Sequence, residues 1–165
     1  MRDTKTPSRV ESNNTLADLL NFIGVDKNFK DSLKSLTPIL DDNLPSILDD
    51  FYALIRSVPE LNAMFTSRDH QDKAKNLQIQ HWNKIISGEF NQDYQDSVTR
   101  IGQVHNRIGL EPKWYIGGYS VLISSMVSSI LRHHMAGYFT NKKKLDICER
   151  QISAFVQAAL LDMDM

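Results

Sequence analysis

The sequence has little cysteine and no excess of charge of either sign, and both absences exclude classes of function. Cys148 is the single cysteine among 165 residues, so the chain forms no internal disulfide and no zinc site built from several cysteines. This favours a reducing, cytoplasmic setting. The 19 basic and 20 acidic residues leave no basic surplus for a general nucleic-acid surface, so we expect no nucleic-acid partner.

The signatures of several enzyme classes are also missing. There is no glycine-rich phosphate loop, no His-Glu-x-x-His zinc motif, and no visible pairing of a nucleophile with a base. The acidic pairs Asp41-Asp42 and Asp49-Asp50 are consecutive, so the two carboxylates of each pair point to different sides of a helix. These residues therefore give no sign of hydrolytic chemistry.

A polar N-terminus and one long apolar run bear on whether the chain has a signal peptide or a membrane-spanning helix. Residues 1–14 lack the apolar centre of a signal peptide and are expected to form a disordered leader before one domain, 15–165. The segment Trp114–Leu131 has 18 residues without a charge, which is long enough to span a membrane. Its five serines and the pair Gly117-Gly118 favour a buried helix in a soluble bundle, although small polar residues also occur in membrane helices.

Apolar residues recur at helical spacing along the chain, and no stretch alternates as a strand does. Glycine, proline and N-capping side chains mark the breaks between the predicted helices. Seven or eight helices are expected: 15–22, a helix capped by Asp26 and interrupted at Pro38, a helix from 43 or 44 to 58 with Pro45 in its first turn, 60–65, 67–87, 91–105, 113–138, and one from 140 or 141 onward. The pattern predicts an all-α bundle.

His105 is the first residue that could carry chemistry. It falls at the end of an amphipathic helix, with Ile101 and Ile108 on the same apolar face. A neutral imidazole in an apolar wall can bind a metal through one ring nitrogen while the other donates a hydrogen bond. The alternative is a core histidine whose nitrogen is satisfied by a backbone carbonyl, and periodicity alone favours that alternative.

Three further side chains have two interpretations each. Tyr52 could donate its hydroxyl to a bound gas molecule, or lie at the core edge as an ordinary amphipathic tyrosine. Gln78 could lie beside a ligand, and His81, on the same helix, could bind a metal from the side opposite His105. Both residues could equally face solvent.

The segment from Phe51 to Tyr119 resembles the globin-coupled sensors, which are bacterial haem sensors related to protoglobins. The resemblance rests on several matching segments, of which the longest is VHNRIGLEPKWYIGGY at 104–119. The others are Asp50-Phe51-Tyr52, Pro59-Glu60-Leu61, Met64-Phe65, His81-Trp82 and Gly88. The resemblance covers roughly Leu16 to Leu161. It implies a globin-like fold, a three-over-three helical sandwich, with 15–22 as an extra N-terminal helix.

The resemblance also implies a site that binds haem b, iron protoporphyrin IX. His105 matches the proximal iron ligand, Tyr52 the distal tyrosine that contacts the gas, and Tyr115 a proximal-side tyrosine that responds to ligation. Ala74, Leu77 and Gln78 fall on the distal helix, where a shift of one turn in the alignment changes which residue faces the ligand. The remaining expected pocket residues are apolar or aromatic: Phe51, Phe65, Val104, Ile108 and Trp114.

By the same resemblance, the chain is expected to be a dioxygen sensor rather than an enzyme, with nitric oxide and carbon monoxide as alternative gases. It would signal through a homodimer formed by Trp114–Leu131 and Leu145–Leu161 to an output domain outside this chain, without membrane insertion. Two other interpretations stay open. One is a stand-alone gas-binding or enzymatic globin of the dioxygenase or peroxidase type, and the other is a haem-free dimerisation module in which His105 is a core residue.

Overall fold

The computed structural model describes residues 12–135 and 142–164, and these residues form helices without any strand. The helices are α1 (Ser12–Phe22), α2 (Lys27–Lys34), α3 (Thr37–Ser57), α4 (Pro59–Asn62), α5 (Arg68–Ile86), α6 (Gln92–Arg107), α7 (Pro112–Met135) and α8 (Lys142–Asp164). The all-α prediction is confirmed. Most of the expected leader, and the expected boundary between the last two helices at 138–141, lie outside the described residues.

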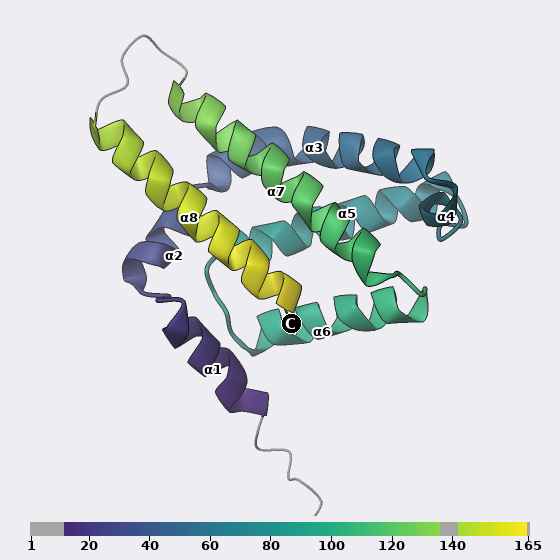
Figure 1. Ribbon diagram of the computed structural model, residues 1–165, viewed down its shortest axis with the longest axis horizontal. Helices are drawn as coiled ribbons and strands as arrows, with labels where there is room; N and C mark the ends of the chain where they lie inside the picture. Colours follow the sequence, from purple (N-terminus) through teal and green to yellow (C-terminus); the bar gives the residue numbers. More distant parts are fainter. Residues whose placement is uncertain (1–11, 136–141, 165) are drawn as a thin grey trace, which may run out of the picture.

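Six helices form two layers (Figure 1). One layer contains α2, α5 and α6, and the other contains α3, α7 and α8. α7 and α8 lie side by side and run obliquely across α5, while α3 packs against both α7 and α5. α1 precedes α2 at the edge of the molecule. This is the predicted three-over-three helical sandwich with an added N-terminal helix.

The breaks between helices fall where the sequence predicts capping residues. Asp26, Ser67 and Asn91 begin α2, α5 and α6, and each side chain accepts a hydrogen bond from the backbone N–H three residues later. Gly88 and Gly109 follow α5 and α6 with φ of 67° and 70°, a conformation that costs glycine little because it has no Cβ. The order and spacing of the helices around the site are therefore encoded locally.

Of the two predictions for the prolines before the site, one is confirmed and one is wrong. The helix that follows Asp26 is interrupted just before Pro38, as predicted, but no new helix begins ahead of Pro45. α3 is continuous from Thr37 to Ser57; Pro38 lies in its first turn, and Pro45 lies inside it. Pro38 is tolerated because the first turn has no internal partner for an N–H that proline lacks. Pro45 and Asp41 are both exposed, so the Asp41 carbonyl that loses its helical partner can bond to water. The predicted helix start at Asn43 or Leu44 is thus replaced by one long helix that reaches the site.

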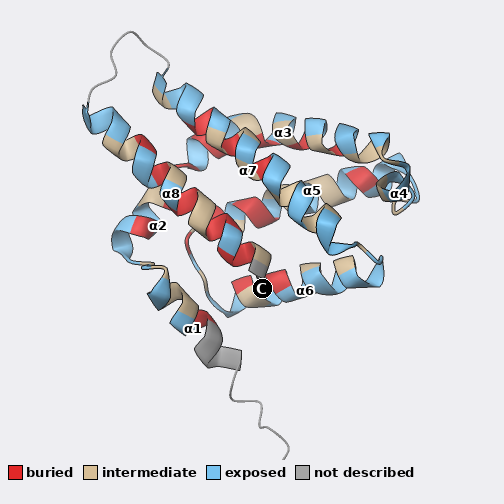
Figure 2. Ribbon diagram, viewed as in Figure 1, coloured by how far each residue is buried: buried red, intermediate tan, exposed pale blue. Residues whose placement is uncertain are grey.

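The hydrophobic core fills one end of the sandwich. Its members come from the first half of α3, the second half of α5, the first half of α6, the second half of α7, and from α2 and α8. Fully buried examples are Leu33, Leu36, Leu48, Ile85, Ile130 and Phe155. At the other end, made by the remaining halves of α3, α5, α6 and α7, most residues are half-buried or exposed (Figure 2).

α7 contains the uncharged run and is long and apolar enough to cross a membrane, with a mean hydropathy of 1.3 over its best 18-residue window. It packs against α3 and α8, as a bundle helix does. Only 22% of that window is buried within the chain, so α7 is less buried than the sequence predicts. Ile116, Val121 and Leu131 are among its exposed apolar side chains.

Candidate functional site

His105 lies near the end of α6, one turn before Gly109 turns the chain toward α7. Its side chain is half-buried, and its Nδ1 atom is fully buried without a hydrogen-bond partner. Burial lowers the pKa of His105 below its ordinary value, because a charged imidazolium is poorly solvated there. The residue is therefore held as neutral imidazole, the form that binds metal ions.

Two more buried side-chain N or O atoms without partners lie on other helices. They are Oε1 of Gln78 on α5 and Nε1 of Trp114 on α7. Together with Nδ1 of His105, they are all such atoms found in the described part of the chain. Buried polar groups are almost always hydrogen-bonded. Three unpaired atoms on three predicted pocket residues therefore indicate a binding site that the protein's own side chains do not fill. The residues fit a bound group lying between α5, α6 and α7.

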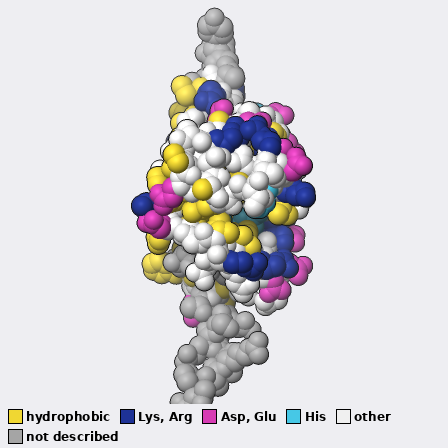
Figure 3. Space-filling model, turned by 90° about the vertical axis from the view of Figure 1, so that its right-hand side faces the viewer, with side chains coloured by type: hydrophobic (Ala, Val, Ile, Leu, Met, Phe, Trp, Pro, Cys, Tyr) yellow, Lys and Arg dark blue, Asp and Glu magenta, His cyan; other side chains and the backbone are white. Residues whose placement is uncertain are grey.

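Apolar side chains at the same end are exposed although the sequence predicts them in a pocket. The exposed fractions are 64% for Leu77, 47% for Val104 and 40% for Ile108. Figure 3 looks at this end and shows hydrophobic side chains gathered in the middle of the face, beside a histidine and with Lys and Arg around them. Apolar groups brought together without being covered are typical of a ligand-binding surface.

The aromatic residues of α3 form the opposite wall. Tyr52 is buried, and its ring contacts those of Phe51 and Phe65 edge-on, with centroids 5.5 and 6.0 Å apart. Burial raises the pKa of Tyr52 to about 12, so its hydroxyl stays protonated and available as a donor at neutral pH. A Cβ on Gly118 would lie 3.4 Å from the Phe51 ring, an ordinary van der Waals contact, so α7 passes close to α3 at this point.

The start of α7 packs beside His105. The ring of Tyr115 lies edge-on to the His105 imidazole at a centroid distance of 5.3 Å. Trp114 is half-buried, and the Lys113 ammonium lies 5.3 Å from its ring centroid. On α5, Ala74 is half-buried. The predicted site residues thus occupy one end of the sandwich, on α3, α5, α6 and α7 and the segment after α4.

His81 does not fit the alternative that it binds a metal opposite His105. It is buried, and its Nε2 lies 2.9 and 3.0 Å from the two carboxylate oxygens of Asp162. Its Nδ1 lies 3.5 Å from the Ser97 hydroxyl. Both ring nitrogens are therefore engaged within the protein, on the side of α5 that faces α6 and α8.

Asp162 is the functional candidate that the sequence analysis missed. It is 1% exposed and accepts hydrogen bonds from the hydroxyls of Tyr94 and Tyr119 as well as contacting His81. A signal for it exists in the sequence: Asp162 falls seven residues after the buried Phe155, so an acidic residue stands at a core position of the last helix.

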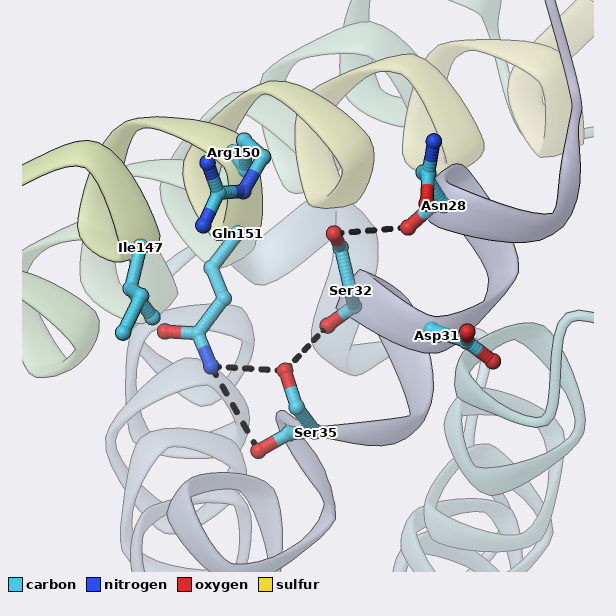
Figure 4. A pocket seen from close by; sticks show the side chains of 7 residues that line it. All are labelled: Asn28, Asp31, Ser32, Ser35, Ile147, Arg150 and Gln151. Atoms are coloured by element: carbon cyan, nitrogen blue, oxygen red, sulfur yellow. Dashed lines mark hydrogen bonds between the residues drawn. The ribbon is translucent and has the colours of Figure 1, made fainter. Parts of the chain in front are cut away.

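A hollow of about 470 Å³ lies elsewhere, between α2 and α8 (Figure 4). Gln151 crosses it and donates from Nε2 to the Ser35 hydroxyl at 2.8 Å. Its Oε1 contacts Nε2 of His134 at 2.5 Å. The lining is largely polar and its buried amide is satisfied, so this hollow lacks the apolar walls and unpaired atoms of the site around His105.

Comparison with known proteins identifies the family. The Protoglobin family model matches residues 12–165. The chain is 24% identical over 112 residues to the haem-based aerotactic transducer HemAT of Halobacterium salinarum; the match covers 67% of this chain and 23% of that protein. The chain therefore spans about a quarter of the length of this relative.

Solved structures agree in fold. The globin domain of the Geobacter sulfurreducens globin-coupled sensor superposes with a TM-score of 0.77 at 17% identity, covering 90% of this chain and 93% of that one. The globin domain of E. coli DosC, in a ferric form, gives 0.62 at 16% identity, covering 90% and 99%. Because the family model matches the sequence from residue 12 to its last residue and the fold agrees, the chain belongs to the Protoglobin family.

Proposed function

We propose that this chain is a haem-based gas-sensing domain in which His105 ligates the haem iron. The observation that carries the proposal is the cluster of buried, unpaired polar atoms on Gln78, His105 and Trp114, beside apolar side chains that the chain leaves uncovered. When bound, haem supplies an iron atom that takes one protein ligand and one diatomic gas molecule. The chain has no Cys-x-x-Cys-His segment for covalent attachment, which supports haem b.

The two sides of the pocket have different tasks. On the proximal side, burial holds His105 neutral, and the Tyr115 ring packs against it and limits its rotation. On the distal side, Tyr52 keeps a protonated hydroxyl among aromatic rings that exclude water. A hydroxyl of this kind donates a hydrogen bond to a gas ligand that carries partial negative charge, which favours dioxygen over carbon monoxide.

A sensing role is supported more than a catalytic one. The aerotactic transducer named above is a sensor by its own description, and the described pocket residues offer Tyr52 as a donor without a charged acid–base pair beside it. The proposed signal leaves through a homodimer in which α7 and α8 meet the same helices of a second copy, and it acts on an output domain outside this chain. Exposed apolar side chains on these helices, including Leu131, Leu145 and Leu160, support such a face.

Haem titration tests the proposal. Haem added to the purified chain should give one Soret-absorbing complex per chain, and His105→Ala should lose that complex or bind haem far more weakly. His133→Ala is the matched control, because His133 is an exposed histidine at the far end of α7. Equal haem affinity and equal spectra for the wild type and His105→Ala would contradict the proposal and leave the haem-free dimerisation module.

A further inference from the structure

A buried carboxylate lies in the last turn of α8 and joins four helices. Asp162 Oδ1 accepts a hydrogen bond from the Tyr94 hydroxyl of α6 at 2.9 Å, and Oδ2 accepts one from the Tyr119 hydroxyl of α7 at 2.5 Å. His81 of α5 contacts both oxygens from its Nε2. A carboxylate buried to this degree is stable only where donors replace its hydration, and three donors do so here.

The two tyrosine hydroxyls are fixed as donors. Burial, followed by the adjacent Asp162 carboxylate, raises the pKa of Tyr94 and of Tyr119 far above the ordinary value. Neither hydroxyl therefore ionises at physiological pH, and each donates its proton to the hydrogen bond with Asp162. The position of the Tyr119 ring is set by the last turn of α8.

Ring contacts continue from Tyr119 to the site. Tyr115 lies one helical turn before Tyr119 on α7, with a centroid distance of 5.0 Å between the two rings. Tyr115 in turn packs against the His105 imidazole at 5.3 Å. Each step is a direct contact, so a shift of Tyr119 displaces the ring that limits the orientation of His105.

We propose that Asp162 is a positioning residue for the proximal histidine: by holding the Tyr119 hydroxyl, it fixes the Tyr115 ring against His105 and links the imidazole to the last turn of α8. The part of this inference that concerns iron rests on the proposed function. The coupling between Asp162 and the imidazole of His105 involves only residues of the chain, so it can be tested without haem.

Tyr94 provides a matched control for Tyr119. Both hydroxyls donate to the same carboxylate from buried rings, so a phenylalanine at either position removes the same kind of bond. Tyr94 lies in the first turn of α6, far along the helix from His105, and its ring packs edge-on to Phe90 at 5.1 Å. A general loosening around Asp162 follows from either change, but displacement of Tyr115 follows only from Tyr119→Phe.

The coupling is tested first in the full chain before haem is added, by the imidazole carbon–proton NMR signals of His105, with His133 as the reference signal. Tyr119→Phe should shift the His105 signals and leave those of His133 in place, whereas Tyr94→Phe should leave both in place. Asp162→Asn should reproduce the Tyr119→Phe shift. If Asp162→Asn does not fold, the two phenylalanine variants decide the question.

The second arm uses the haem-loaded chain. The iron–histidine stretching frequency of the ferrous protein should move in Tyr119→Phe and stay at the wild-type value in Tyr94→Phe. Unchanged His105 signals in Tyr119→Phe, or equal changes in both phenylalanine variants, would overturn the positioning role of Asp162. If the chain takes up no haem, the proposed function fails, and the first arm still decides the coupling.

Discussion

The Tyr115 ring stands edge-on to the imidazole of His105, with centroids 5.3 Å apart and ring planes inclined by 63°. The two residues lie on opposite sides of the turn between α6 and α7, so this contact joins the helices where the pocket begins. An imidazole that is pulled or released by a metal cannot rotate freely without moving Tyr115. The contact therefore connects a ligand at His105 directly to α7, a helix with several exposed apolar side chains.

Replacement of Tyr52 with phenylalanine should speed release of dioxygen by about tenfold. A hydrogen bond to a polarised acceptor contributes about 1–2 kcal/mol, and that free energy corresponds to a factor of this size. The ring contacts with Phe51 and Phe65 remain, so the pocket keeps its shape. Stopped-flow release from the haem-loaded chain measures the effect. Tyr94→Phe is the control, and an unchanged rate in Tyr52→Phe would remove Tyr52 from the distal site.

Two glutamines test whether the pocket is incomplete without a bound group. Oε1 of Gln78 is buried and unpaired, so Gln78→Met should leave the haem-free chain as stable as the wild type or raise its free energy of unfolding by about 1 kcal/mol. Gln151 is also buried but bonds to Ser35 and His134, so Gln151→Met should lower that free energy by about 1–3 kcal/mol. Denaturant titration compares them, and equal destabilisation by both substitutions would refute the incomplete pocket.

Alkaline titration should show that the tyrosines resist ionisation. Tyr52, Tyr94, Tyr115 and Tyr119 all have pKa values raised by burial from an ordinary 10.0, and that of Tyr52 reaches about 12. The stability that follows from holding these phenols neutral is fully present below pH 10, because both folded and unfolded chains then keep the proton. Above pH 10 only the unfolded chain releases it, so the free energy of unfolding should fall as pH rises toward 12.

The measurement is tyrosinate absorbance together with denaturant titrations at several pH values. Stability that stays constant from pH 9 to pH 12, or tyrosinate absorbance that rises fully near pH 10 in the folded chain, would show that the four rings are solvated.

The apolar face of α7 and α8 should form a homodimer. Leu131 and Leu160 are 40% and 48% exposed, and a glutamate at either position places a charge where the proposed interface excludes water. Leu131→Glu should shift the chain toward the monomer in sedimentation experiments. Leu54→Glu, at a comparably exposed leucine on α3, should leave the association unchanged. A wild type that is monomeric at high concentration would exclude the dimer.

The sequence predicts local features of this fold well and long-range pairings poorly. Asp26, Ser67 and Asn91 begin helices as predicted, because an N-cap depends only on the next few residues. The interruption predicted at Pro38 is present, but the helix start predicted just before Pro45 is not, since packing of the long α3 outweighs the loss of a hydrogen bond at an exposed position.

The site residues also divide into those recognisable from the local sequence and those that depend on long-range contacts. His105, with its apolar neighbours, is recognisable within one helix, and the resemblance adds Tyr52 and Tyr115. The partnership of His81 with Asp162 joins residues 81 positions apart, and no local pattern reports it. For that reason the sequence leaves open whether His81 binds a metal or faces solvent, whereas the structure gives it a buried carboxylate as partner.

The most direct test of the account is the iron–imidazole bond itself. In His105→Gly the haem-loaded, ferrous chain should lose the iron–histidine stretching band in the resonance Raman spectrum, and added imidazole should restore a band at a similar frequency by entering the space left by the side chain. A band that persists in His105→Gly without imidazole would mean that another residue holds the iron, and the function proposed from the surroundings of His105 would be wrong.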